Sequence, residues 1–414
     1  MVAEERTERT FRCERWRAVA SGVLETASGT FLLLIAVRYF GAGAVPKALV
    51  AASSSVGLLL SPLVVSSVSA ARLTTARAAS WLAAAGASCF LILAAWPSLP
   101  LFVVGSVLAM AASTSAIPLV TQIYQDNYPE RDRGRRFSRT VMIRIAVAAA
   151  FSQLAGYALS SDASYPRWLL VAFAAAFTLA SGCFARCPSQ PLSPDGGAHP
   201  FRALRFVRTD RLFRHTLICW MLLGFANLMM LPLRVEYLAN AEYGVTLQGT
   251  ALTAGMIALL IGVVPNLARL ALSPVWGWLF DRMNFFVLRM TLNLGFALGI
   301  LTFFTSHDLP GLLLAAVLYG VATAGGDVAW SLWVTKFSPS DRVADYMSVH
   351  TFLTGVRGVL APLVAFQLVA HVSMVTMGWI SASLILVATL LLLPEVKHGR
   401  SARPAPALVE EVSE

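Results

Sequence analysis

Five charged side chains stand inside long apolar stretches of this sequence. Two are carboxylates, Glu25 and Asp327, and three are guanidinium groups, Arg144, Arg269 and Arg357. An ionisable side chain at the centre of a bilayer costs about 2.5–3.5 kcal/mol, so those that persist there usually face a cavity or a partner. A carboxylate in such a place can exchange a proton, and a deep arginine can bind a carboxylate or phosphate. We therefore treat these five residues as candidates for coupling or cavity charges.

The stretches that hold these charges are long enough to be membrane-spanning helices. The chain is 57% hydrophobic and 13% charged, which is about half the charged share of a soluble protein. One helical span needs about 20 apolar residues. The sequence therefore predicts an all-α polytopic membrane protein. We expect twelve spans, at residues 18–39, 47–70, 78–96, 99–122, 140–160, 167–185, 216–238, 251–276, 288–305, 311–334, 348–370 and 374–393.

Positive charge falls on one side of the predicted membrane. When the loops are assigned alternately to the two sides, 25 of the 32 Lys and Arg lie on the side of the termini. Only four lie on the opposite side: Arg38, Lys47, Arg167 and Arg234. The positive-inside rule then predicts that both termini are cytoplasmic. Contact of these loops with anionic lipids accounts for the net charge of +10, so no nucleic-acid partner is expected.

A central segment divides the chain into two similar halves. Residues 186–215 contain Pro and Gly followed by regularly spaced arginines, which is typical of a break and then a cytoplasmic surface helix on anionic headgroups. Segments 128–138 and 338–348 align without a gap at an offset of 210 residues, which also places Arg282 on Arg72. Such internal repeats are common in membrane transport proteins. The predicted parts are a cytoplasmic segment at 1–17, six-helix bundles at 18–185 and 216–393, the central loop at 186–215, and a disordered cytoplasmic tail at 394–414.

The segment Gly277–Arg282 (GWLFDR) resembles the first half of the loop signature of the major facilitator superfamily, Gly-x-x-x-Asp-Arg. Together with two halves of six spans, it identifies the chain as similar to that superfamily over most of its length. The resemblance implies that Gly277 allows two helices to approach closely. It also implies that Asp281 and Arg282 take part in a latch that holds the halves in one state. Ala71 stands where the first-half copy of the acid is expected, so the latch is expected to be asymmetric or weakened.

The resemblance also predicts partners for the buried charges. The first and fifth helices are neighbours in this superfamily, so Glu25 and Arg144 are expected to pair. This pair is either a proton-exchanging site or a static, self-neutralising one. Asp327 follows two glycines and lies at the depth of Arg269, whereas Arg357 lies somewhat deeper. Either arginine could neutralise Asp327, and the glycines suit either a broken helix at a transport site or close helix packing.

Other side chains complete the expected cavity and its ends. We expect cavity contacts from polar and aromatic residues at mid-helix: Asn227, Asn266, Gln153 and Trp330. His350 shares a helix face with Arg357 and is interpreted as a surface histidine near the cytoplasmic end. Arg234 and Glu236, near the outer end of their helix, are expected to form an external gate or a surface pair.

The resemblance implies a secondary active transporter that works by alternating access. We expect proton coupling through Glu25 or Asp327 and a small solute, polar or anionic because deep arginines are available to meet it. An exporter or flippase of lipophilic drugs or lipids is the alternative, although residues 103–122 lack the arginine usual in proton-driven drug antiporters. A membrane sensor that does not transport is a third reading.

Nothing in the sequence predicts an enzyme. The six histidines are scattered, and there is no metal-ligand spacing or phosphate-binding Gly-Lys-Ser loop. We therefore expect no enzymatic activity, cofactor or metal. The Ala- and Arg-rich composition favours the inner membrane of a bacterium, where we expect a monomer in contact with lipids, its solute and protons.

Overall fold

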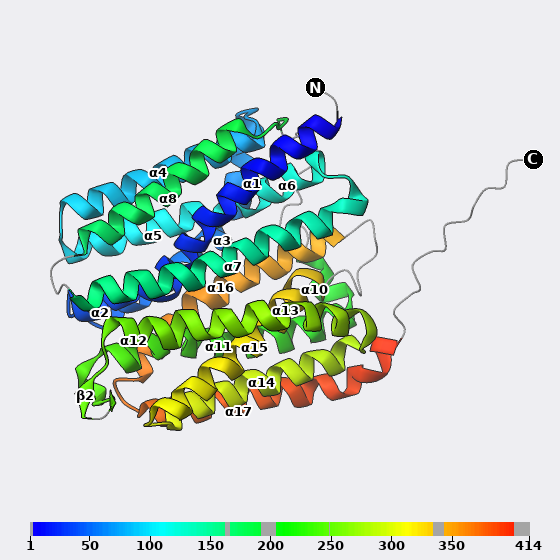
Figure 1. Cartoon of the computed structure of the whole chain (residues 1–414). Coiled ribbons are helices and arrows are strands. Elements are labelled where there is room, and N and C mark those ends of the chain that lie inside the picture. The colour runs from blue at the N-terminus through cyan, green and yellow to red at the C-terminus, as the bar shows by residue number, and fades with distance from the viewer. Residues whose placement is uncertain (1–2, 162–165, 192–203, 248, 334–342, 401–414) are drawn as a thin grey trace, which may run out of the picture.

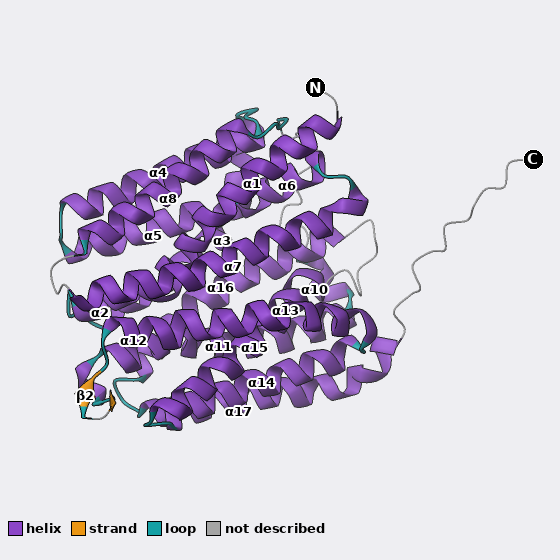
Figure 2. Ribbon diagram, in the orientation of Figure 1, coloured by secondary structure: helices purple, strands orange, loops and turns teal. Residues whose placement is uncertain are grey.

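Twelve helices of the computed structural model are long and apolar enough to cross a membrane, as predicted (Figure 1). The structure describes residues 3–161, 166–191, 204–247, 249–333 and 343–400. Helix dominates this part of the chain, and strands occur only in a short hairpin of β1 (Thr246–Leu247) and β2 (Thr250–Ala251) (Figure 2). The predicted all-α polytopic fold is therefore confirmed.

The N-terminal bundle contains the first six spans. The first span is one continuous rod of α1 (Ala3–Thr26), the π-helical turn η1 (Ala27–Phe31) and α2 (Leu32–Arg38). Its helix begins well before residue 18, because residues 3–17 continue it without a break. The other elements are α3 (Ala44–Ala70), α4 (Thr75–Ala95), α5 (Leu99–Ser115), α6 (Ile117–Asn127), α7 (Glu130–Ser161) and α8 (Arg167–Arg186).

The C-terminal bundle contains the other six. The second of its spans is again divided by a π-helical turn, η3. The elements are α10 (Arg205–Thr209), α11 (Arg211–Ala239), η2 (Ala241–Tyr243), α12 (Ala254–Ala258), η3 (Leu259–Val263), α13 (Val264–Arg282), α14 (Phe285–Thr305), α15 (Leu309–Leu332), α16 (Val343–Leu368), α17 (Met374–Leu392) and η5 (Leu393–Arg400).

The helix boundaries repeat at the offset seen in the sequence. Helices α3, α4 and α5 each begin 210 residues before α12, α14 and α15. The two equivalent helices α4 and α14 even begin with side-chain caps at equivalent positions. The Thr74 side chain accepts a hydrogen bond from the Arg77 backbone N–H, and the Asn284 side chain accepts from the backbone of Phe286 and Val287. Caps of this kind satisfy backbone donors that the first helical turn leaves unpaired.

The central segment differs from the predicted surface helix. Residues 192–203 lie outside the described residues, and the helix that follows, α10, ends at Thr209. Asp210 then accepts a hydrogen bond from the Phe213 backbone N–H and starts α11. Arg211 and Arg214 therefore belong to the first turn of a spanning helix, because the aspartate acts as its N-cap. Within the tail predicted to be disordered at 394–414, η5 extends to Arg400, and residues 401–414 lie outside the described part.

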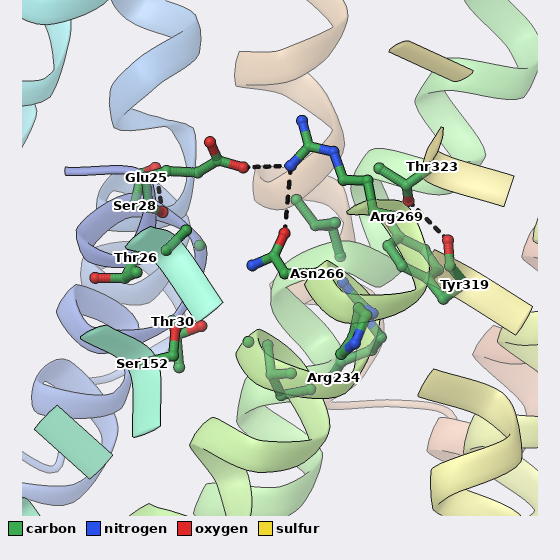
Figure 3. Close-up of a pocket in the computed structure, with 16 residues that line it drawn as sticks. Glu25, Thr26, Ser28, Thr30, Ser152, Arg234, Asn266, Arg269, Tyr319 and Thr323 are labelled. Carbon is green, nitrogen blue, oxygen red and sulfur yellow. Dashed lines mark hydrogen bonds and ion pairs between the residues drawn. The ribbon is translucent and has the colours of Figure 1, made fainter. Parts of the chain in front are cut away.

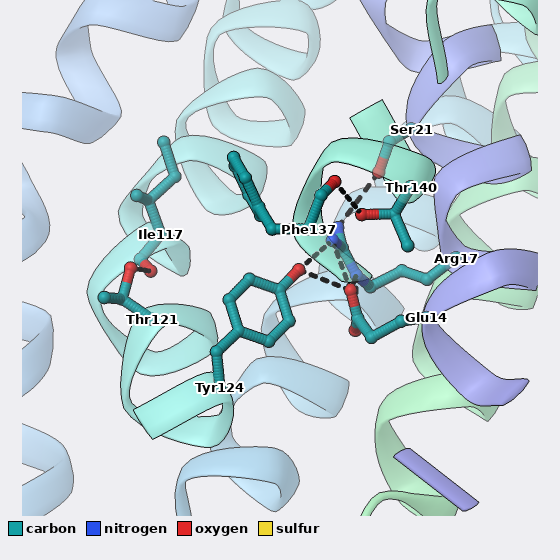
Figure 4. Close-up of polar contacts among 8 residues, drawn as sticks. All are labelled: Glu14, Arg17, Ser21, Ile117, Thr121, Tyr124, Phe137 and Thr140. Atoms are coloured by element: carbon teal, nitrogen blue, oxygen red, sulfur yellow. Dashed lines mark hydrogen bonds and ion pairs between the residues drawn. The ribbon is translucent and has the colours of Figure 1, made fainter. Parts of the chain in front are cut away.

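A buried polar cluster holds the start of the chain on the N-terminal bundle (Figure 4). Arg17 forms an ion pair with Glu14 at 2.7 Å and donates a hydrogen bond to the Tyr124 hydroxyl at 2.7 Å. The Tyr124 hydroxyl in turn donates to the Glu14 carboxylate, which is 1% exposed. Buried charges are tolerated when they are paired and hydrogen-bonded in this way. The cluster therefore fixes α1 against α6.

The two bundles lie side by side, with both termini at one end (Figure 1). We call this the terminal end, and the opposite end, which carries β1 and β2, the distal end. Small residues bring the bundles together. An added Cβ at Gly358 of α16 would overlap Ser55 of α3, and one at Gly262 of η3 would overlap Ser152 of α7. Close helix approach through small residues is the usual mode of packing in membranes.

One pair of glycines gives a test of this packing. A Cβ at Gly57 of α3 would overlap the Thr114 hydroxyl and the Ala111 carbonyl of α5. Among the described residues, no atom lies within 4 Å of a Cβ placed at Gly277, so the close approach expected there is absent. Gly57→Ala is therefore expected to lower the free energy of unfolding by about 1–3 kcal/mol through overpacking. Gly277→Ala should be neutral or stabilise by up to about 1 kcal/mol through helix propensity. Thermal unfolding in detergent measures both, and equal midpoints for the two variants would contradict the packing described here.

Candidate functional site

A cavity of about 260 Å³ lies between the two bundles (Figure 3). Its wall comes from α1, η1 and α7 on one side and from α11, η3, α13 and α15 on the other. Hydroxyl groups are frequent in this wall, together with a few aliphatic side chains. The hydroxyl-bearing residues are Thr26, Ser28, Thr30, Ser152, Tyr319 and Thr323. Its volume lies just below the roughly 300–1,000 Å³ typical of ligand pockets, which suits a small solute.

Both π-helical turns line this cavity. Ser28, Gly29 and Thr30 of η1 and Ile261 and Gly262 of η3 belong to its wall, and the two turns contact each other across the bundles. Single π-helical turns inside α-helices are frequent at functional sites. Sequence analysis missed them. The available signal was a run of weak helix formers, Ser28 and Gly29, just after Glu25.

An ion-pair network joins the bundles at the cavity. Arg269 of α13 binds Glu25 of α1 through Nη1 at 2.5 Å and Asp327 of α15 through Nε at 2.6 Å. Arg144 of α7 lies 3.2 Å from the other oxygen of Glu25. The structure thus forms the expected Glu25–Arg144 pair and selects Arg269 over Arg357 as the partner of Asp327. The Glu25–Arg269 bond was not foreseen, because it connects different halves of the chain.

The network is balanced only while both carboxylates are ionised. Arg269 is 7% exposed, whereas the side chains of Glu25 and Asp327 are 31% and 41% exposed. Two unit charges 4 Å apart attract by about 4 kcal/mol at the effective dielectric constant near a protein surface. Protonation of either carboxylate removes one such attraction. A proton on Glu25 therefore weakens the contact of Arg269 with the N-terminal bundle and leaves its contact with Asp327 in the C-terminal bundle.

Arg234 lines the same cavity and is not where the sequence suggested. Arg234 is 5% exposed, and its guanidinium group stacks over the Tyr319 ring, 3.6 Å from the ring centroid. The expected Arg234–Glu236 pair is not formed. Glu236 is fully buried and binds Lys47 at 2.5 Å instead. The prediction was wrong because residues two apart point to nearly opposite sides of a helix.

The predicted polar wall residues separate into two groups. Asn266 lines the cavity and accepts a hydrogen bond from Arg269 at 3.4 Å. Asn227 is not among the lining residues and accepts a hydrogen bond from the Tyr319 hydroxyl of the wall at 3.4 Å. Gln153 is exposed, because Ser152 takes the cavity-facing position and the next residue turns about 100° away. Trp330 packs against His350 in an aromatic cluster outside the cavity wall.

That aromatic cluster, formed by Trp220, Trp330 and Trp333, corrects the interpretation of His350. The imidazole is fully buried and lies 5.4 Å from the Trp220 ring and 5.2 Å from the Trp333 ring, measured between centroids. It is therefore not a surface histidine. Arg357 lies in the same region and donates from Nη1 to the Trp220 carbonyl at 2.5 Å. It is absent from the cavity wall, unlike Arg269 and Arg234.

The loop motif is described only in part. Arg282 is exposed and stacks over Trp278 of its own helix, 4.4 Å from the ring centroid. The side chain of Asp281 lies outside the described residues. The equivalent first-half position, Arg72, adopts a left-handed backbone conformation with φ of 51° at the end of α3.

Several hydrogen bonds close the distal end between the bundles. Arg38 donates to the carbonyls of Ala239 and Leu252, at 3.2 and 2.5 Å. Lys47 of α3 binds Glu236 of α11, as described above. The Gly255 backbone N–H donates to the Ser160 hydroxyl at 2.8 Å. Between described residues, the only further hydrogen bond that crosses the bundles is Glu25–Arg269. These contacts between described residues close the cavity on its distal side.

Comparison with known proteins agrees with this architecture. The family model for the Major Facilitator Superfamily matches residues 260–411. The nucleoside transporter NupG has the same fold, with a TM-score of 0.73 over 95% of this chain and 99% of that one, at 14% identity. The resemblance to the major facilitator superfamily is therefore confirmed. A D-xylose–proton symporter matches with a TM-score of 0.69 over 94% of this chain and 98% of that one, at 16% identity.

A third solved structure has the same fold. A peptide transporter in complex with sulfate also matches, with a TM-score of 0.67 over 95% of each chain, at 15% identity. No curated protein matches the chain. At such identities the solved structures establish the major facilitator fold and leave the solute open. The three solved structures named here are described as transporters.

Proposed function

We propose that this protein is a proton-coupled secondary active transporter that moves a small polar or anionic solute by alternating access. The observation that carries the proposal is the double engagement of Arg269, which binds one carboxylate from each bundle. The positive-inside distribution supports a bacterial inner-membrane protein with both termini in the cytoplasm. We assign a monomer as the working unit, because one chain supplies both walls of the cavity.

The network provides a route for coupling. In alternating access, one bundle rocks against the other around a fixed central site. The Glu25–Arg269 bond resists that motion, because it joins α1 to α13. Protonation of Glu25 removes its attraction to Arg269, while Asp327 holds the arginine within its own bundle. The two carboxylates thus take different roles, Glu25 as the proton carrier and Asp327 as the anchor.

The cavity wall favours this reading over an exporter of lipophilic compounds. Hydroxyl groups, Asn266 and two arginines line a small space. A lipophilic ligand would leave the buried Ser152 hydroxyl and the Arg234 guanidinium, which have atoms without a partner in the protein, still without hydrogen bonds, at a cost of about 1–3 kcal/mol for each buried group. Two of the similar structures are described as a D-xylose–proton symporter and a nucleoside transporter.

Uptake into proteoliposomes tests the coupling. The purified chain is reconstituted and offered a panel of radiolabelled nucleosides, D-xylose, dipeptides and monocarboxylates. With one proton per solute, a gradient of one pH unit is worth about 1.4 kcal/mol and supports about tenfold accumulation. Glu25→Gln is expected to abolish accumulation and to keep solute exchange without a gradient.

The matched control is Glu8→Gln, on the same helix. Glu8 is largely exposed and binds Arg136 at the surface, so its amide should accumulate solute like the wild-type protein. Asp327→Asn is expected to impair both accumulation and exchange, because the anchor of Arg269 is lost. Undiminished accumulation by both Glu25→Gln and Asp327→Asn would overturn proton coupling through this network.

A further inference from the structure

We infer that Arg234 is the anion-binding residue of the cavity and that the transported solute is a small monocarboxylate. This inference rests on the proposed function and names the class of its solute. It begins with a buried cation that lacks a counter-ion. Arg234 is 95% buried, since its exposure is 5%, and its Nε and Nη1 atoms have no hydrogen-bond partner. Among the described residues, no carboxylate lies within ion-pair distance of it.

An unpaired buried guanidinium is costly, and an anion in the cavity would remove the cost. Moving a charge out of water costs several kcal/mol unless a partner compensates it. Stacking on Tyr319 offsets part of this through a cation–π interaction. It does not satisfy the in-plane donors of the guanidinium. Those donors form a fixed fork that matches the two oxygens of a carboxylate.

Arg269 is the other arginine of the cavity wall, and its donors already have partners. Arg269 gives its donors to Glu25, Asp327 and Asn266. Arg357 donates to a backbone carbonyl within the C-terminal bundle and is absent from the cavity wall. In Figure 3, Arg234 lies on the opposite side of Asn266 from the Glu25–Arg269 contact. Anion binding at Arg234 therefore leaves the coupling network intact.

The charges of the residues in and beside the cavity indicate how many charges the solute carries. In and beside the cavity, Arg144, Arg234 and Arg269 carry three positive charges and Glu25 and Asp327 carry two negative charges. While both carboxylates are ionised, one positive charge is left over, and a monoanion neutralises it. A dianion would reverse the excess, and a neutral solute would leave Arg234 unpaired. The single excess charge thus favours a monoanion over both.

The shape of the cavity fits a small molecule of this class. A volume of about 260 Å³ is that of about nine water molecules at roughly 30 Å³ each. The Ser152 hydroxyl lines the same space, is 1% exposed and has no hydrogen-bond partner. It can donate to a second polar group of the solute or accept from it. Carboxylates with a short body that carries a second polar group satisfy both requirements.

Equilibrium binding to the purified full chain in detergent tests the inference. The probes are acetate, lactate, benzoate and nicotinate, each compared with its neutral amide at pH 7 by calorimetry and thermal shift. At least one acid is expected to bind, and its amide at least tenfold more weakly. Arg234→Gln should weaken binding of that acid at least about 30-fold, the lower range for losing one partner of a buried pair. Arg234→Lys, which keeps the charge, should recover part of the loss.

Arg289→Gln is the matched control. Arg289 is also 5% exposed and also stacks over an aromatic ring, that of Trp220, but it does not line the cavity. Its variant should bind the acid like the wild-type protein. Equal binding of acid and amide, unchanged binding by Arg234→Gln, or no binding of any acid would each overturn the inference. The comparison of acid and amide uses the wild-type chain, so it tests the inference even if the Arg234→Gln variant does not fold.

The binding experiment can fail independently of the transport experiment that tests the proposed function. Binding is measured without a pH gradient, so a failure of proton coupling leaves the acid–amide result unchanged. Conversely, absence of acid binding overturns the solute class, while accumulation of a nucleoside or sugar would still support proton-coupled transport.

Discussion

Replacing Arg269 by glutamine is expected to abolish solute accumulation and to lower the free energy of unfolding by about 3 kcal/mol. The substitution leaves Glu25 and Asp327 without their shared cation at the interface of the two bundles. Removing one partner of a buried ion pair typically costs about 3–5 kcal/mol. We expect the lower value because both carboxylates are partly exposed and keep some contact with water. Thermal unfolding and proteoliposome uptake measure the two effects.

A compensated variant separates charge balance from transport. Combining Arg269→Gln with Glu25→Gln and Asp327→Asn removes three of the four charges and should restore most of the stability, since no unpaired carboxylate remains and Arg144, whose side chain is 36% exposed, keeps contact with water. Uphill uptake should stay absent, because no proton carrier is left. Arg77→Gln, an exposed arginine on α4 that stacks over Trp81, is the control and should change neither property. Wild-type accumulation by Arg269→Gln would show that the network plays no part in coupling.

The positions of elements along the chain could be predicted from the sequence, because they depend on local hydrophobicity. Apolar stretches of about 20 residues predict spans whatever their neighbours are. The twelve spans and the 210-residue repeat are local properties of this kind, and the structure contains both. The pairing of Glu25 with Arg144 could also be predicted, because the superfamily resemblance makes their helices neighbours.

Side-chain direction could not be predicted in the same way, because it depends on how each helix is rotated. Arg234 and Glu236 are two residues apart, yet one lines the cavity and the other binds Lys47. Ser152 faces the cavity and Gln153 the exterior. His350 is enclosed by Trp220 of α11 and by Trp330 and Trp333 at the end of α15, which belong to helices other than its own. When a helix has no strong polar stripe, its rotation about its own axis cannot be predicted from the sequence alone.

Lys47→Ala is expected to open the distal end. Glu236 is fully buried. Among the described residues, its only cationic partner is Lys47, which lies in the other bundle. Without Lys47, the closed state holds an uncompensated buried carboxylate, which typically costs about 3–5 kcal/mol. The open state exposes Glu236 to water and escapes this cost. The equilibrium should therefore shift toward the open state by a factor of at least about 100, since each 1.4 kcal/mol is tenfold.

Disulfide trapping at the distal end measures this shift. Ser160 and Gly255 belong to different bundles, and an added Cβ at Gly255 lies 3.3 Å from the Ser160 hydroxyl oxygen. Ser160→Cys with Gly255→Cys, in a background without the five native cysteines, should cross-link readily in the closed state. Adding Lys47→Ala should slow cross-linking strongly, and further adding Glu236→Gln should restore it, because the neutral amide tolerates burial better than the carboxylate. Arg167→Ala removes an exposed cation at the same end and should have no effect. Equal cross-linking rates with and without Lys47 would mean that the Arg38 contacts close the distal end on their own.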